Sequence, residues 1–316
     1  MKVTIFGVGA IGGHLAARLG DRTGHDLSVV ARGETLAAIM RDGVSLTWRD
    51  GTVQQARPRG VGDADQLPVQ DVVIVALKAP ALPAAATDIG ALIGPDTFVA
   101  FVLNGIPWWY DARISRLDPT GSLLHTIPLD RCVAVVAYSA NEVLKPGQVA
   151  THTSSGDRYL VGRCSDEGLR AAQAVSALLN EAEIDAPLCM DIKPIIWRKL
   201  MMNTAFSGVS ALARQRVGDA CQDPELARLI RAVAQDVHRV ASALSINIDP
   251  ISDVEWEAIS RSTHRSSLLQ DLELDRATEI DAMFQAPLDL AEQYNLEVPA
   301  LRIVTALLAV RARRCC

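Results

Sequence analysis

The first part of the chain alternates short apolar runs with segments in which apolar residues recur at helical spacing. Apolar runs that predict buried strands lie at residues 3–6, 27–31, 71–76 and 97–103. Helical spacing lies between them, at residues 11–19, 34–41 and 79–92. Strands that alternate with helices form a parallel, doubly wound sheet, and right-handed crossovers place the helices on both of its faces.

Two regions depart from this alternation. A hairpin is predicted at residues 44–48 and 52–55, because Asp50-Gly51 favours the tight turn between them. After about residue 131 strands follow one another more closely, at residues 132–139, 147–153 and 159–162, before a helix at 167–180.

From about residue 192 onwards the pattern is helical throughout. Helices are predicted at residues 195–212, 224–244, 255–261, 278–294 and 300–313, and Pro250 and Pro299 stand where helices should begin or end. The chain is therefore expected to have an α/β domain over residues 1–190, followed by an all-α domain over residues 191–316.

Composition fits a folded chain of this size. The 316 residues suffice for two domains of roughly 100–200 residues each. A net charge of −6 argues against a general nucleic-acid binder, which usually carries a basic face. No apolar run reaches the roughly 18–20 residues needed to span a membrane, so no membrane partner is expected.

The N-terminus and the cysteines bear on the expected location. Residues 1–13 resemble an export signal, but their patterned glycines predict a buried strand and a turn, so a cytoplasmic protein is expected. The cysteines form no CxxC pair and no zinc spacing with a histidine, so reduced thiols and no metal site are expected. Cys315 and Cys316 are expected to lie in an exposed tail.

The first strand-to-helix junction carries a glycine motif. It reads Gly7-Val8-Gly9-Ala10-Ile11-Gly12, a G-x-G-x-x-G that follows a predicted strand and opens a predicted helix. In such a junction the first glycine permits a tight turn, the second lets the backbone approach a pyrophosphate, and the third lets the helix pack closely on the strand. The free N–H groups of the helix then face the phosphates. The motif predicts a Rossmann-type dinucleotide site.

The residue after the second predicted strand bears on which dinucleotide binds. An acidic residue there would accept a hydrogen bond from the ribose 2′-hydroxyl of NAD. This chain has Arg32, whose guanidinium pairs well with the 2′-phosphate of NADP. NADPH is therefore the expected cofactor. Glu34 leaves an alternative open, because its carboxylate can contact the ribose or cap the next helix.

Candidate catalytic residues follow two further strands. Ligands of open α/β sheets bind beyond the carboxyl ends of the strands, where Lys78 and Asn104-Gly105 stand. Lys78 is alternatively a solvated loop cation, and Asn104 a turn residue, because Asn-Gly is itself a turn signal.

The helical part adds a second set of polar candidates. Lys199 and Asn203 are four residues apart among apolar neighbours and share a helix face. A partly desolvated lysine can have a lowered pKa and act as a general acid, although it can also extend its head to water. Glu279 is, from its spacing alone, equally well an acid in the first turn of a helix.

These motifs, taken in order, resemble the ketopantoate reductase family over residues 3 to about 310. The motifs are the glycine turn at 7–13, Leu77-Lys78-Ala79, Asn104-Gly105, Trp197-Arg198-Lys199-Leu200 with Asn203, Ser267-Leu-Leu-Gln-Asp271, and Arg276-Ala-Thr-Glu279-Ile-Asp281. The resemblance implies a Rossmann domain followed by an all-α domain, with the active site in the cleft between them. It also implies NADPH-dependent reduction of ketopantoate, a small 2-oxo acid, to pantoate.

The resemblance assigns a role to each candidate residue. Lys199 resembles the general acid, and Glu279 the acid that orients this lysine and the substrate. Asn203 and Ser267 resemble the groups that hold the substrate. Asn104 and Lys78 resemble the residues near the nicotinamide and its ribose, and Arg32 the ligand of the 2′-phosphate.

The chain departs from the family pattern beside these motifs. Trp108-Trp109-Tyr110 follows Asn104-Gly105, Ser207 stands where the family often has a second Asn, and Gln285-Ala286 replaces the usual Asn-Gly. The aromatic triplet either packs a loop or reshapes the pocket for a bulkier 2-oxo acid, as in a D-2-hydroxyacid dehydrogenase.

A dinucleotide sensor without turnover is a further alternative. Helices at 224–244 and 300–313 can pack within a subunit or across a homodimer.

Overall fold

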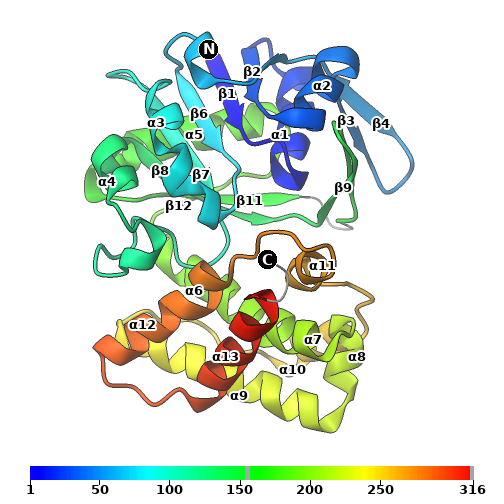
Figure 1. Cartoon of the computed structure of the whole chain (residues 1–316), viewed down its shortest axis with the longest axis vertical. Helices are drawn as coiled ribbons and strands as arrows, with labels where there is room; N and C mark the ends of the chain where they lie inside the picture. The colour runs from blue at the N-terminus through cyan, green and yellow to red at the C-terminus, as the bar shows by residue number, and fades with distance from the viewer. Residues whose placement is uncertain (154–156, 314–316) are drawn as a thin grey trace. The chain divides into compact units, whose positions relative to one another are not determined.

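The chain folds into two compact units, each assembled from separate stretches of sequence (Figure 1). The computed structural model describes residues 1–153 and 157–313, so Cys315 and Cys316 lie outside the described residues. Unit 1 comprises Met1–Leu77, Ala81–Leu103 and Thr120–Ile192, and unit 2 comprises Lys78–Pro80, Asn104–Pro119 and Lys193–Cys316. The helical unit therefore includes two loops from within the first 190 residues, which no sequence pattern indicated.

Unit 1 is built on a mixed sheet. Its strands in spatial order are β12 (Leu188–Cys189), β11 (Arg158–Arg163), β8 (Cys132–Tyr138), β7 (Phe98–Val102), β6 (Val72–Val75), β1 (Lys2–Phe6), β2 (Asp26–Val30) and β5 (Arg59–Val61). Neighbours from β8 to β5 run parallel, as predicted, but β11 runs antiparallel to β8. The reason is that β8 is followed by strands of another sheet and not by a crossover helix, so the chain returns in the opposite direction.

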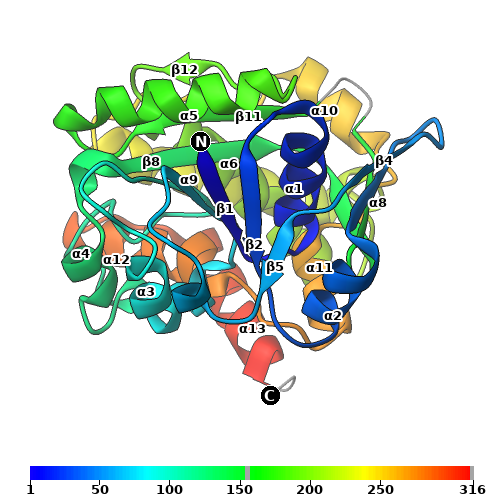
Figure 2. The same cartoon turned by 90° about the horizontal axis from the view of Figure 1, so that it is seen from above.

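Helices cover both faces of this sheet (Figure 2). On one face lie α1 (Ala10–Arg22) and α5 (Leu169–Glu181), which contact each other, and on the other lie α3 (Leu82–Gly90) and α4 (Ser122–Thr126). The helix α2 (Gly33–Asp42) packs against β5. Because both faces are covered, central strands such as β6 are apolar at every position, which is why continuous apolar runs located them.

A smaller sheet packs on α1. Its strands in spatial order are β4 (Val53–Ala56), β3 (Val44–Thr47), β10 (Gln148–Thr151) and β9 (Asn141–Lys145). The predicted hairpin is confirmed, since β3 and β4 pair antiparallel and Gly51 takes a φ of +86° in the turn. All strands of this sheet contact α1, which therefore lies between the two sheets.

Unit 2 is a bundle of helices around the long helix α9. Its α-helices are α6 (Lys193–Met202), α7 (Gly208–Ala213), α8 (Val217–Gln222), α9 (Pro224–Ala243), α10 (Asp253–Ser260), α11 (Ser267–Glu273), α12 (Ala286–Gln293) and α13 (Pro299–Arg313). The carboxylate of Asp236 on α9 accepts hydrogen bonds from the N–H groups of Ala300 (2.8 Å) and Leu301 (3.0 Å), which caps α13. Among the described residues, no helix combines the length and apolarity that a membrane crossing requires.

Two π-helical turns interrupt the predicted helices. One, at Asn203–Ser207, separates α6 from α7, and the other, at Asp281–Gln285, precedes α12. The predictions of uninterrupted helices at 195–212 and 278–294 were wrong at these turns, because apolar spacing does not distinguish a single π-helical turn from an α-helical one. Such turns occur frequently at functional sites, and both lie beside candidate residues.

Candidate active site

The glycine turn of unit 1 joins β1 to α1 as its sequence predicts. Gly7 has a φ of +94°, which favours glycine, and its N–H donates to the carbonyl of Val30 on β2. A Cβ on Gly12 would lie 1.9 Å from the carbonyl oxygen of Gly7, so only glycine lets the helix approach the strand this closely. These two positions fix α1 directly against the carboxyl end of β1.

The start of α1 suits a bound pyrophosphate. Gly9 is the N-cap, and no side chain caps the helix there. A Cβ on Gly9 would have no atom within 4 Å, so the turn is open on that side. The first N–H groups of the helix, from Ala10 and Ile11 onwards, have no acceptor within the helix. Open space beside uncapped N–H groups fits the phosphates of a dinucleotide.

Arg32 stands at the N-cap of α2, two residues after the last residue of β2. Its side chain is 74% exposed, and one guanidinium nitrogen lies 2.9 Å from the Asp88 carboxylate on α3. A planar cation with this exposure can pair with a phosphate, although Asp88 would compete for it. Glu34 lies in the first turn of α2 and is exposed.

Unit 2 brings Asn104 and Glu279 into direct contact. The Asn104 amide Nδ2 donates to Oε2 of Glu279 at 3.1 Å, and the N–H of Ala79 donates to Oε1 at 3.4 Å. Burial raises the pKa of Glu279, and these two hydrogen bonds with the charges of Lys78 and Lys199 offset the rise only in part. The carboxyl therefore sits in a setting that disfavours its charge.

Lys199 lies on α6, partly buried. Burial lowers the pKa of its ammonium to about 8, against the opposing charge of Glu279. An ammonium with such a pKa releases its proton readily near neutral pH, which a general acid requires. The lysine that stands among apolar residues in the sequence is thus desolvated, and the charge of Glu279 acts on its pKa.

Lys78 is held by an acid that the sequence did not assign. Its Nζ lies 2.7 Å from Oδ1 of Asp271 and donates to the carbonyl of Ala277 at 2.8 Å. Asp271 is buried on α11, five residues after the buried N-cap Ser266. Its place at the end of the Ser267–Asp271 stretch was the available signal, but spacing alone does not separate a buried acid from an exposed one.

The two expected substrate ligands differ in their surroundings. Asn203 is partly buried, begins the first π-helical turn and lies one turn after Lys199. Ser267 is exposed at the first position of α11, and its neighbour Ser266 accepts from the N–H of Leu269 to cap that helix.

The loop that carries Asn104 is fastened to the second π-helical turn. The N–H of Ile106 donates to the carbonyl of Ala282 at 2.8 Å. That carbonyl is available because Ala286 N–H bonds to Asp281 and the next residue, Pro287, has no N–H. A Cβ on Gly105, whose φ is +80°, would lie 2.6 Å from the Ala282 carbonyl. Asn-Gly thus serves as a turn here and also presents Asn104 to Glu279.

In the aromatic triplet, Tyr110 packs against a different face of α6. Trp108 and Trp109 are buried. The Tyr110 hydroxyl accepts from the indole N–H of Trp197 at 2.7 Å, and the Tyr110 ring lies 5.9 Å from Nζ of Lys193. Trp197 precedes Lys199 by two positions, which is about 200° around the helix. The contacts of Tyr110 are therefore on the side of α6 away from Lys199.

Comparison with known proteins gives matches over nearly the whole chain. Residues 3–163 match the family model "Ketopantoate reductase PanE/ApbA", and residues 191–312 match "Ketopantoate reductase PanE/ApbA C terminal". The 2-dehydropantoate 2-reductase of Mesorhizobium japonicum is 34% identical over 317 residues, which cover 97% of this chain and 96% of that protein.

Solved structures share the fold. A candidate ketopantoate reductase from Ralstonia solanacearum MolK2 has a TM-score of 0.91 at 29% identity, over 99% of this chain and 98% of that one. D-mandelate dehydrogenase, solved with NADH and anilino(oxo)acetate, has a TM-score of 0.86 at 20% identity, over 100% and 99% of the two chains. The resemblance seen in the sequence is confirmed: the chain belongs to the ketopantoate reductase PanE/ApbA family and is an NAD(P)-dependent oxidoreductase.

Proposed function

We propose that this protein reduces 2-dehydropantoate (ketopantoate) to (R)-pantoate with NADPH. The observation that carries the proposal is the Glu279 carboxyl held by Asn104 and the Ala79 backbone, whose charge acts on the desolvated Lys199, in a chain that also has an open dinucleotide turn. The relative from Mesorhizobium japonicum, a 2-dehydropantoate 2-reductase, supports this substrate.

Lys199 is the proposed proton donor. When bound, the reduced nicotinamide supplies a hydride to the carbonyl carbon of the oxo acid. Negative charge then develops on the carbonyl oxygen, and the Lys199 ammonium stabilises that charge and gives up its proton. Because the lysine is desolvated, its interaction with the developing charge is stronger than in water.

Glu279 and Asn104 are proposed to orient this donor and the substrate. The Glu279 carboxyl is fixed by hydrogen bonds from Asn104 and from the backbone of Ala79, so its position does not depend on Lys199. Its charge opposes the loss of the Lys199 proton before substrate arrives. Asn203, one turn after Lys199, and Ser267 are the proposed ligands of the substrate hydroxyl and carboxylate.

A reductase of a bulkier 2-oxo acid is the second candidate, because D-mandelate dehydrogenase shares the fold. The sequence feature that suggested it was the aromatic triplet. Tyr110 contacts Lys193 and Trp197, which supports a packing role for this residue of the triplet. A packing role favours the smaller substrate.

A substrate panel tests the proposal. Oxidation of NADPH is followed with ketopantoate, other branched 2-oxo acids and aromatic 2-oxo acids. We expect the highest kcat/KM for ketopantoate. A higher value for an aromatic 2-oxo acid would keep the mechanism and replace the substrate.

The cofactor preference is tested at Arg32, with NADH as the control. Replacing the cation by an acid, Arg32→Glu, should lower kcat/KM for NADPH on the order of tenfold or more, because the 2′-phosphate loses its partner. The value for NADH should change less. Equal losses for the two dinucleotides would remove Arg32 from the 2′-phosphate site.

A further inference from the structure

Helix α1, which follows the glycine turn, is enclosed by protein on every side. Each of its residues from Gly12 to Leu19 is buried, among the two sheets and α5. Two of the enclosed residues, His14 and Arg18, are polar and lie four positions apart on one face. A polar group in such surroundings must find its hydrogen-bond partners within the protein.

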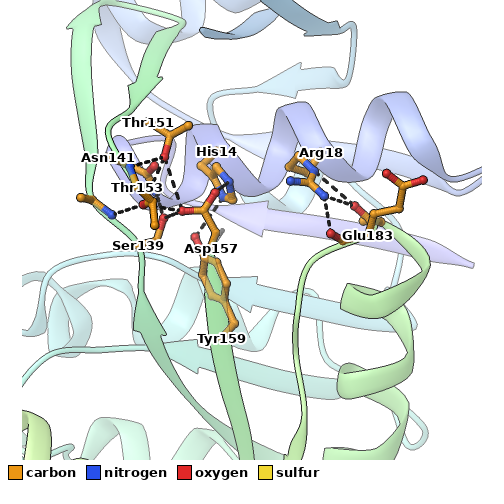
Figure 3. Close-up of polar contacts among 11 residues, drawn as sticks. His14, Arg18, Ser139, Asn141, Thr151, Thr153, Asp157, Tyr159 and Glu183 are labelled. Atoms are coloured by element: carbon orange, nitrogen blue, oxygen red, sulfur yellow. Dashed lines mark hydrogen bonds and ion pairs between the residues drawn. The ribbon is translucent and has the colours of Figure 1, made fainter. Parts of the chain in front are cut away.

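His14 is held at both ring nitrogens (Figure 3). Its Nε2 lies 2.9 Å from Oδ2 of Asp157, and its Nδ1 lies 2.9 Å from the hydroxyl of Tyr159. The imidazole and the phenol are stacked, with ring centroids 5.7 Å apart, and both side chains are fully buried. Asp157 directly precedes β11 and Tyr159 is its second residue, and both are more than 140 residues away from His14 in sequence.

The other carboxylate oxygen of Asp157 accepts from hydroxyl groups (Figure 3). Thr153 lies at 2.9 Å and Thr151 at 3.4 Å, and Ser139 also donates to it. Burial raises the pKa of Asp157, but the hydrogen bonds and charge of His14 together with the hydroxyl donors outweigh this and bring it to about 2. Burial raises the pKa of Tyr159 well above its usual range. An ionised carboxylate and a protonated phenol therefore lie against the two ring nitrogens of His14.

Arg18 supplies a second attachment on the same face (Figure 3). Its guanidinium donates to the carbonyl of Ala182, at 3.2 and 2.8 Å, and to that of Glu183 at 2.5 Å, where α5 ends. The Trp48 ring packs beside both polar residues of α1, with its centroid 6.4 Å from that of His14 and 5.0 Å from Cζ of Arg18.

At Gly12 and Gly13, behind the open turn at Gly9, α1 has almost no free space around it. Besides the contact of Gly12 with Gly7, a Cβ on Gly13 would lie 2.5 Å from Cγ2 of Val149 on β10. Contacts of glycine and alanine set how close the helix lies, but they are not directional and do not fix its rotation. Hydrogen bonds from His14 and Arg18 are directional and do fix it.

We propose that His14, Asp157 and Tyr159 are positioning residues for the dinucleotide: they set the rotation of α1 and through it the direction of the N–H groups at Gly9–Gly12. This inference rests on the proposed cofactor function. The cluster itself is closed to ligands, because His14 and Tyr159 have no exposed surface. Its influence on binding must therefore pass through the helix.

Binding of NADPH in the absence of oxo acid tests the proposal, with nicotinamide fluorescence as the readout. His14→Leu should weaken binding about tenfold, or about 1.4 kcal/mol. Tyr159→Phe, which removes a single hydroxyl, should weaken it less. His14→Gln should restore part of the loss, because glutamine can both donate and accept. Amide hydrogen exchange at residues 10–13 should be faster in the leucine variant than in wild type.

Asp236→Asn in unit 2 is the matched control. It removes the charge of another buried carboxylate that bonds a helix, so it should lower thermal stability and leave the dissociation constant for NADPH within about twofold. If His14→Leu and Tyr159→Phe behave like this control, the positioning role is overturned. If the leucine variant fails to fold, Tyr159→Phe decides. A wild-type protein that binds neither NADPH nor NADH would overturn the cofactor function, and this proposal with it.

Discussion

Both units bury charged side chains, but their surroundings shift the pKa values in opposite directions. In unit 1, Asp157 accepts from an imidazole and several hydroxyls, and its pKa is lowered to about 2. In unit 2, burial outweighs the few donors of Glu279 and raises its pKa, while it lowers the pKa of Lys199 to about 8. A buried carboxylate with a full set of hydrogen-bond donors stays ionised, which suits it to a structural role. Buried groups with few hydrogen-bond partners have pKa values closer to neutral pH and can exchange protons, which is typical of catalytic sites.

The largest expected effect comes from removing the Lys199 side chain. Lys199→Ala should lower kcat about 10²- to 10⁴-fold, because the proposed proton donor is lost. NADPH binding should persist, since the glycine turn belongs to unit 1. The measurements are steady-state kinetics and a binding titration. Retained turnover would remove Lys199 from the role of general acid, and a wild-type protein without turnover would favour the sensor.

The next effect is on the pH dependence of folding stability, to which the Asp157 carboxylate contributes. The folded pKa of Asp157, about 2, lies below its ordinary value of 3.8, so the carboxylate stabilises the fold above about pH 4. That contribution, roughly 2 kcal/mol, should be lost as the pH falls from about 4 to 2. Denaturant unfolding across this range should show a shallower pH dependence for Asp157→Asn than for wild type. Identical slopes would contradict the assignment.

The buried hydrogen bond between Tyr110 and Trp197 involves no charged group and gives the third effect. Tyr110→Phe leaves the buried indole N–H of Trp197 without its acceptor, which should cost about 1–3 kcal/mol of unfolding free energy. The ratio of kcat/KM between ketopantoate and an aromatic 2-oxo acid should stay the same, because Tyr110 contacts the other face of α6. A changed ratio would return the aromatic triplet to the substrate pocket.

The smallest effect is a shift of the pH profile. The kcat/KM of wild type for reduction should fall as the pH rises through about 8, where the Lys199 ammonium loses its proton. Glu279→Gln removes a charge that holds this pKa up, so the decline should begin at lower pH. Glu292→Gln, at an exposed position, serves as the control and should not change the pH profile of kcat/KM. A shift to higher pH would contradict the pairing.

Local patterns were sufficient where the local structure around a residue depends on its neighbours in sequence. The glycine turn, the apolar strands and Lys199 within an apolar helix are of this kind. Patterns were not sufficient where distant segments meet. His14 finds partners 143 and 145 residues away, and Lys78 finds Asp271 through a contact that no spacing encodes. The short strand β12 and the polar β9 carry too few apolar residues to predict.

The assembly of unit 2 from three stretches has a consequence for synthesis on the ribosome. Trp108 and Trp109 emerge long before the helices α6 to α13, which make up most of their unit. At usual elongation rates the delay is on the order of ten seconds. During that time the indoles lack most of the unit in which they become buried, and exposed indoles are natural targets for chaperones. A fragment that ends at residue 192 should therefore aggregate, even though it contains every strand of unit 1.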